Sequence, residues 1–270
     1  MTSESLSWIL FHVFILAVLA LDLGVFHRKA HVVRMREALI WSAVWVTLAM
    51  LFNLGIYLGW VGDYPAELRQ DKALEFLTGY LIEESLSVDN VFVFALIFRS
   101  FHIPAIYQHR VLFWGIIGAL AMRAGMIFAG VALLKHFHAV LYIFGAFLVF
   151  TGIRMWTGGA VTVDRERNPL LKLSRRLFPV TPDFDGQHFF TKLGGKVAIT
   201  PLAVSLIAVE WSDLVFAVDS IPAVLAVTDD AFIVYTSNIM AILGLRSLYF
   251  ALSGMIAKFH LLHYGLAALL

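Results

Sequence analysis

The sequence predicts an all-α polytopic membrane protein with about eight transmembrane helices and two inverted three-helix repeats. Its 270 residues are 60% hydrophobic and only 14% charged, and the mean hydropathy is +0.83. Soluble domains are nearly half apolar and about a quarter charged. The composition therefore excludes a soluble globular enzyme, and it provides enough apolar residues for about eight spans of roughly 20 residues each.

Eight apolar runs have a length close to that of a membrane span. We expect helices, because a chain in lipid must satisfy its backbone internally and the alternating segments of a membrane barrel are absent. The first run has no basic leader and no small-residue cleavage site, so we interpret it as a retained span and not a signal peptide. The runs cover 6–26, 38–60, 73–98, 111–134, 139–156, 197–226, 231–252 and 259–270.

Lysine and arginine gather in alternate connections between these runs. They lie around 28–36, at both ends of 99–110 and throughout 157–195, whereas 227–230 and the residues before the first run have none. The positive-inside rule therefore places the N-terminus outside and the basic loop 157–195 in the cytoplasm. The net charge of +1 and the lack of a long basic run provide no electrostatic footprint for nucleic acid.

The two halves of the chain resemble each other at a nearly constant offset. Asp89-Asn-Val-Phe matches Asp213-Leu-Val-Phe, and Arg123 matches Arg246. Each repeat holds three spans, an odd number, so consecutive copies must be inverted, as in many secondary transporters. The predicted organisation is two N-terminal helices in 1–72, a first repeat in 73–156, a basic linker in 157–195 and a second, incomplete repeat in 196–270.

Eight ionisable residues lie deep within the predicted spans, and six of them are acidic. A charge near the bilayer centre costs at least about 2.5–3.5 kcal/mol on insertion scales. We assign the two arginines to structural ion pairs between helices, which leaves a surplus of negative charge. A cation must bind there, or several acids must be protonated. The eight residues are Glu83, Glu84, Asp89, Arg123, Glu210, Asp213, Asp219 and Arg246.

The third run carries polar side chains that suit a hard cation. Glu83, Ser87 and Asn90 fall at i, i+4 and i+7, so they share one face of a helix. Carboxylates, amides and hydroxyls are the ligands that Mg²⁺, Ca²⁺ and Mn²⁺ prefer in proteins. Cysteine is absent, which excludes disulfides and thiolate metal sites.

The sixth run carries three further acids. Glu210 and Asp213 are neighbours at i, i+3, but Asp219 is rotated by about 120° from Asp213 on an ideal helix. All three can converge only if the helix opens locally. Pro222 removes a donor to the carbonyl four residues before it, and this predicts irregular backbone at 218–222.

We expect the acids of the third and sixth runs to form one shared metal site. The spacing leaves open whether Glu83 or Glu84 faces the ion. The predicted ligands are Glu83, Asp89, Asn90, Glu210, Asp213 and Asp219, with Glu84, Ser87 and Ser220 as secondary candidates.

Three segments resemble the TerC family, which is named for tellurite resistance, and they are most similar to the Alx-like manganese exporters within it. The segments are LDLGVFHRKAHVVRMREALIWSAVW at 21–45, EESLSVDNVFVF at 83–94 and EWSDLVFAVDSIPAV at 210–224. The resemblance implies a bacterial inner-membrane exporter, with Mn²⁺ as the transported ion and no cofactor. It also implies that the following intramembrane residues take part in transport: Glu83, Asp89, Asn90, Glu210, Asp213 and Asp219.

The resemblance also bears on the C-terminus. The family runs on through further apolar sequence after the stretch that begins at Tyr264. The internal repeat likewise predicts an eighth span longer than the run 259–270. We therefore expect this chain to be truncated within its eighth span.

The sequence thus predicts a secondary transporter that moves a divalent metal ion across the lipid bilayer, and not an enzyme. Close carboxylates cannot all stay ionised without the metal, because like charges and burial both disfavour the ionised forms. Protons are therefore expected as counter-ions, with electrogenic leak of the metal as the alternative. Two other classes stay open: an intramembrane aspartyl protease, and a non-transporting metal sensor or metallation partner for secreted metalloenzymes.

Overall fold

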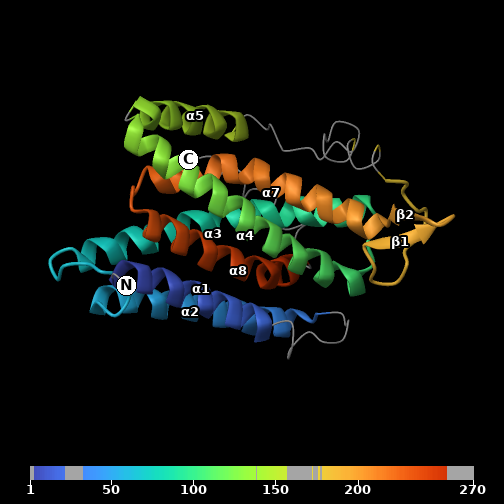
Figure 1. Cartoon of the computed structure of the whole chain (residues 1–270), viewed down its shortest axis with the longest axis horizontal. Helices are drawn as coiled ribbons and strands as arrows, with labels where there is room; N and C mark the ends of the chain where they lie inside the picture. Colours follow the sequence, from blue (N-terminus) through green and yellow to red (C-terminus); the bar gives the residue numbers. More distant parts are fainter. Residues whose placement is uncertain are drawn as a thin grey trace.

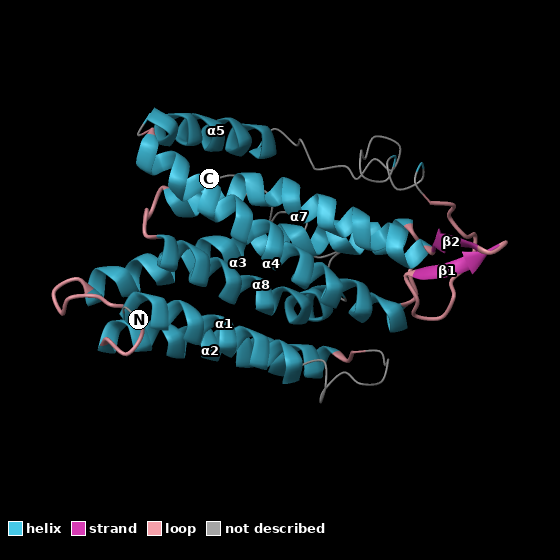
Figure 2. Ribbon diagram, viewed as in Figure 1, coloured by secondary structure: helices cyan, strands magenta, loops and turns pink. Residues whose placement is uncertain are grey.

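The fold is a bundle of helices that run roughly along one direction (Figures 1 and 2). The computed structural model describes residues 3–21, 33–137, 139–156, 172, 176 and 178–253. The helices are α1 (Ser3–Leu21), α2 (Met35–Leu58), α3 (Arg69–Ser100), α4 (Ala105–His136), α5 (Ala139–Trp156), α7 (Pro201–Leu225) and α8 (Ala231–Ser253).

Seven of the eight predicted runs overlap these helices, although residues 197–199 belong to a β-strand, and the eighth run, 259–270, lies outside the described residues. Within the described part of the chain, four helices are long and apolar enough to cross a membrane: α2, α4 over Ala105–Leu134, α7, and α8 over Ala231–Leu252. An all-α membrane protein is therefore confirmed. The count of eight spans stays a prediction, and so does the expected truncation of the C-terminus.

Capping residues explain where several helices begin and end. Thr200 accepts a hydrogen bond from the backbone N–H of Ala203 (3.4 Å), and Pro201 occupies the first position of α7, a residue type that suits a helix start. Asp230 accepts two backbone N–H bonds at the start of α8. Gly59 ends α2 with a φ of 76°, a left-handed conformation that glycine adopts without strain.

The predicted irregular backbone at 218–222 is wrong. Helix α7 is continuous from Pro201 to Leu225, with Pro222 inside it. The proline lies within the last turn, so only one backbone donor is lost near a helix end, where unsatisfied groups are normal. The acids of α7 therefore keep the separate directions of a regular helix.

A β-hairpin lies within the region that the sequence assigned to the linker and the start of the second repeat. Strand β1 (Phe190–Leu193) pairs antiparallel with β2 (Lys196–Ile199). Gly194 and Gly195 join them with φ values of 57° and 80°, as a two-residue type I′ turn requires. The hairpin leads directly into α7 (Figure 1).

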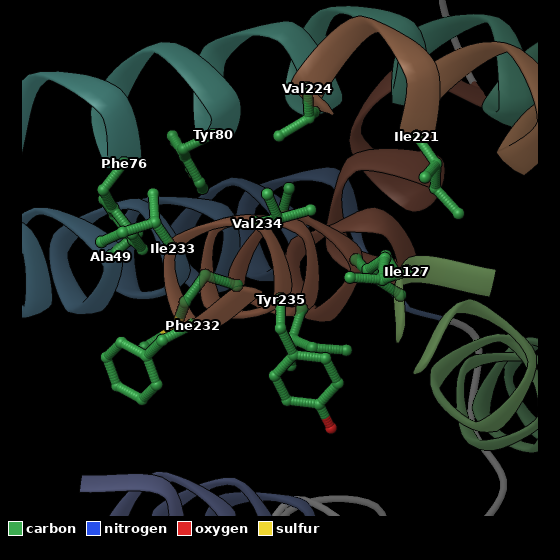
Figure 3. Packing of buried hydrophobic residues seen from close by; sticks show 14 of the residues in the cluster. Ala49, Phe76, Tyr80, Ile127, Ile221, Val224, Phe232, Ile233, Val234 and Tyr235 are labelled. Atoms are coloured by element: carbon green, nitrogen blue, oxygen red, sulfur yellow. The ribbon is translucent and has the colours of Figure 1, made fainter. Parts of the chain in front are cut away.

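Helix α8 is the centre of the bundle. Within its span 89% of the residues are buried, against 22% for α2. It packs against α2, α3 and α4, and α7 packs against α3, α4 and α5. Figure 3 shows the core that results, in which Ile233 and Val234 of α8, Phe76 of α3 and Val224 of α7 are fully buried.

The outer helices present apolar side chains on the surface of the bundle. On α5, Tyr142, Ile143, Phe150 and Ile153 are all strongly exposed. In water such a surface is unfavourable, whereas in a bilayer the same side chains contact lipid tails. The distribution of apolar side chains thus agrees with an integral membrane protein.

Helices α3 and α7 run in opposite directions. In Figure 1, the loop from α2 enters α3 at one end of the bundle, and β2 enters α7 at the other. These are the helices that carry the two acidic motifs. Their opposite directions agree with an inverted repeat, which itself stays a prediction.

Candidate intramembrane charge site

Arg123 of α4 is the centre of a buried ion-pair cluster. Its side chain is fully buried. Nη2 lies 2.9 Å from Oδ1 of Asp213 and Nε lies 3.1 Å from Oδ2, so the guanidinium binds this carboxylate with two parallel hydrogen bonds. Nη1 forms an ion pair with Oε1 of Glu83. Bidentate charged hydrogen bonds of this kind are the strongest that side chains make.

Two neutral side chains complete the cluster. Nη1 of Arg123 lies 3.4 Å from both Oγ of Ser220 and Oδ1 of Asn238. The amide of Asn238 also donates to Oε2 of Glu83, at 2.8 Å. The cluster thus joins α3, α4, α7 and α8. Arg123 thus forms ion pairs between helices, with Glu83 and Asp213 as its acidic partners, and its expected structural role stays a prediction.

Glu83 and Glu84 point to different neighbours. Glu83 is fully buried and belongs to the Arg123 cluster. Glu84 lies against α8, where its carboxylate is about 4 Å from the place of a Cβ at Gly244. Oε2 of Glu84 is buried and has no hydrogen-bond partner among the described residues. Of the two glutamates, Glu83 is therefore the one that shares a site with Asp213.

Glu210 lies one turn before Asp213 on α7 and packs directly against α4. A Cβ added at Gly118 would overlap its carboxylate. Oε2 of Glu210 is buried and, within the described part of the chain, makes no hydrogen bond. Gly118 was not a predicted site residue. The available signal was its position, because a glycine inside an apolar helix pattern can have a packing reason.

The other predicted ligands lie on the same two helices. Ser87 and Asn90 are buried on α3, and each has one oxygen without a hydrogen-bond partner in the described residues. Asp89 and Asp219 are partly buried, each six residues beyond a member of the cluster. Among the described residues no three His, Cys, Asp or Glu side chains are placed to hold a metal ion. The shared metal site therefore stays a prediction.

A small cavity lies beside Asp213. Its space for water centres is about 10 Å³, which corresponds to roughly one water molecule. Four helices line it: α3 with Phe94, α4 with Ala119, α7 with Asp213, and α8 with Arg246. Asp213 therefore contacts Arg123 and also lines a cavity that Arg246, the predicted repeat counterpart of Arg123, lines as well.

A second polar cluster ties α3 to the turn between α7 and α8. Lys72 lies 2.8 Å from Glu75 and 3.5 Å from Asp230, and Thr228 donates a hydrogen bond to Glu75. Burial alone would lower the pKa of Lys72, but Glu75 and Asp230 outweigh it and raise that pKa above its ordinary value. Sequence reasoning missed this cluster, because Lys72 and Glu75 are about 150 residues away from Thr228 and Asp230 in the chain.

Comparisons with known proteins agree with the predicted resemblance. Residues 68–270 match the family described as "Integral membrane protein TerC family". An uncharacterized membrane protein from Myxococcus xanthus is 55% identical over 263 residues, which cover 97% of this chain and 80% of the relative. A protein from Rickettsia bellii, also an uncharacterized membrane protein, is 44% identical over 265 residues, 98% of this chain and 85% of its own length.

A further relative has a more specific name. The "Putative membrane-bound redox modulator Alx" of Escherichia coli (strain K12) is 47% identical over 266 residues, which cover 98% of this chain and 83% of the relative. No solved structure matches the chain. The apolar helices, the two acidic motifs and these matches lead to one assignment. The chain belongs to the TerC family of integral membrane proteins.

Proposed function

We propose that this chain is a secondary transporter of the bacterial inner membrane that exports Mn²⁺ from the cytoplasm in exchange for protons. The observation that carries the proposal is the excess of buried acid around Arg123. Glu83 and Asp213 share one guanidinium, so the cluster has more negative than positive charge. Such an arrangement attracts a cation to the centre of four helices.

The chemistry of the site favours a hard divalent ion. Carboxylate, hydroxyl and amide oxygens of Glu83, Asp213, Ser220 and Asn238 all face the guanidinium of Arg123, and oxygen ligands of this kind suit Mg²⁺, Ca²⁺ and Mn²⁺. The choice of Mn²⁺ among these ions rests on the resemblance to manganese exporters.

The same acids supply the proposed coupling. Glu84 and Glu210 each hold a buried oxygen that has no hydrogen-bond partner among the described residues. A buried carboxylate without a partner is costly when ionised, so protons neutralise such groups when no metal is bound. Arrival of Mn²⁺ favours the ionised forms and releases those protons. Metal and protons then compete for one set of groups.

The name of the Escherichia coli relative describes a redox modulator. These 270 residues contain no cysteine, so they provide no thiol for disulfide exchange. The proposed metal transport uses the buried carboxylates that the chain does have.

The test is uptake of Mn²⁺ into inverted membrane vesicles, whose interior corresponds to the outside of the cell. Vesicles that contain the chain should take up Mn²⁺ faster than vesicles without it, and an acidic interior should increase the rate. With Asp213→Asn, the rate of Mn²⁺ uptake should fall to that of vesicles without the chain. Binding of Mn²⁺ without any uptake would instead favour a metal sensor or a metallation partner.

A further inference from the structure

The guanidinium of Arg123 lies between carboxylates that the proposed function assigns to the metal. Glu83, Asp213 and Ser220, three of its four side-chain partners, are also candidate ligands. Mn²⁺ and the guanidinium cannot both lie between Glu83 and Asp213, because each takes the same oxygens and the two cations repel each other. Metal binding therefore requires the guanidinium to leave.

We propose that Arg123 is a tethered cation that competes with the transported metal: it bridges Glu83 and Asp213 when the metal is absent, and it displaces the metal when it returns. The inference rests on the proposed function and assigns Arg123 a part in the transport cycle. A buried ion pair often contributes no more to stability than apolar packing of the same volume, so stability alone does not call for a buried arginine here.

A second acidic side chain of α7 lies toward the N-terminal side of Arg123. A side chain on a helix tilts toward the N-terminus of that helix, which for Arg123 is the direction of Gly118. Glu210 lies against Gly118, and its Oε2 is buried without a hydrogen-bond partner in the described residues. We infer that the displaced guanidinium moves toward this carboxylate, which belongs to the residue one turn before Asp213 on α7.

Two variants of Arg123 separate competition from a structural role. Arg123→Gln removes the competing charge, so it should bind Mn²⁺ at least about tenfold more tightly than the wild type. Its transport should fall, because no internal cation displaces the ion. Arg123→Lys keeps the charge but cannot form the bidentate fork, so it should bind Mn²⁺ about threefold more tightly. Arg99→Gln, at an exposed position on α3, is the matched control and should change neither quantity.

The experiment titrates Mn²⁺ into the purified full chain and measures the free ion by EPR, with flux measured on the same proteins in liposomes. Tighter binding together with slower flux supports the inference. If the wild type binds Mn²⁺ and the folded variants bind equally or more weakly, the competition is refuted and the transport proposal stands. If Arg123→Gln does not fold, the Mn²⁺ affinity and flux of Arg123→Lys test the competition instead. If the wild type neither binds nor transports Mn²⁺, both proposals fail.

Discussion

Single residues decide the chemistry at the centre of this bundle. Arg123 is fully buried and contacts side chains from α3, α7 and α8. Removal of one partner from a buried ion pair costs about 3–5 kcal/mol, because the other charge then stays buried without compensation. Substitutions here therefore change stability and function together, and the two effects need separate measurements.

Asp213→Asn should abolish Mn²⁺ export while the protein stays in the membrane. The amide keeps the shape of the side chain but loses the charge that binds Arg123 and, in our proposal, the metal. The same loss of export is expected for Asp89→Asn and Asp219→Asn. The measurement is manganese tolerance of a strain that depends on the chain, with membrane abundance measured by immunoblot. Normal tolerance in any of these strains contradicts the assignment of that residue.

Gly118→Ala should destabilise the protein by about 1–3 kcal/mol and reduce transport. The added methyl group would overlap the carboxylate of Glu210, so either the side chain or the α4–α7 contact must shift. Gly125→Ala on the same helix is the matched control, because nothing lies within 4 Å of its Cβ position. There, alanine should stabilise the helix by up to about 1 kcal/mol. Equal thermal unfolding of both variants would show that Gly118 has no special role.

At the scale of elements, the length of an apolar run was a reliable guide. Seven runs overlap helices, because a backbone in lipid has few other ways to satisfy its hydrogen bonds. The hairpin β1–β2 was missed, since its strands are short and lie in a polar, charged region. Gly194-Gly195 between two strand-like segments was its only signal. The irregular backbone expected near Pro222 is not observed, because a proline in the last turn of a helix removes only one backbone donor.

The turn between α7 and α8 yields a prediction about one ion-pair cluster. Lys72→Met removes the contacts with Glu75 and Asp230 and should cost up to about 1 kcal/mol, as expected for a partly exposed pair. The raised pKa of Lys72 means that its contribution is complete below the ordinary value and is lost as pH rises through the folded value. The difference in thermal stability between variant and wild type should thus stay constant from neutral pH to about pH 9. A difference in thermal stability that shrinks within this pH range would contradict the raised pKa of Lys72.

For the whole molecule, the sequence was a better guide to which residues are unusual than to the contacts between them. Glu83 and Asp213 were identified as unusual because charge is costly in lipid. Their joint contact with Arg123 depends on the packing of α3, α4 and α7, which no local pattern encodes. The direction of the chain in the membrane, by contrast, is predicted from the distribution of Lys and Arg.

That direction can be tested cleanly, because the chain has no cysteine. A single cysteine placed within 157–195 should react with a membrane-impermeant maleimide only in inverted vesicles. A single cysteine within 61–68 should react only in intact cells or right-side-out vesicles. Labelling of both positions from the same side would refute the predicted topology.

The proposed coupling of metal to protons concerns the whole molecule. Buried acids lie on α3 and α7, which run in opposite directions (Figure 1). In our proposal this one set of groups binds either Mn²⁺ or protons. Antiport predicts that Mn²⁺ entering a proteoliposome expels protons and raises the internal pH, and that an acidic interior accelerates entry. Electrogenic leak through a negatively charged cavity predicts instead that flux follows the membrane potential and leaves the internal pH unchanged. Simultaneous measurement of Mn²⁺ flux and internal pH, with the potential clamped by potassium and valinomycin, separates the two. If flux neither shifts internal pH nor responds to an imposed pH gradient, antiport is refuted even where the metal site stands.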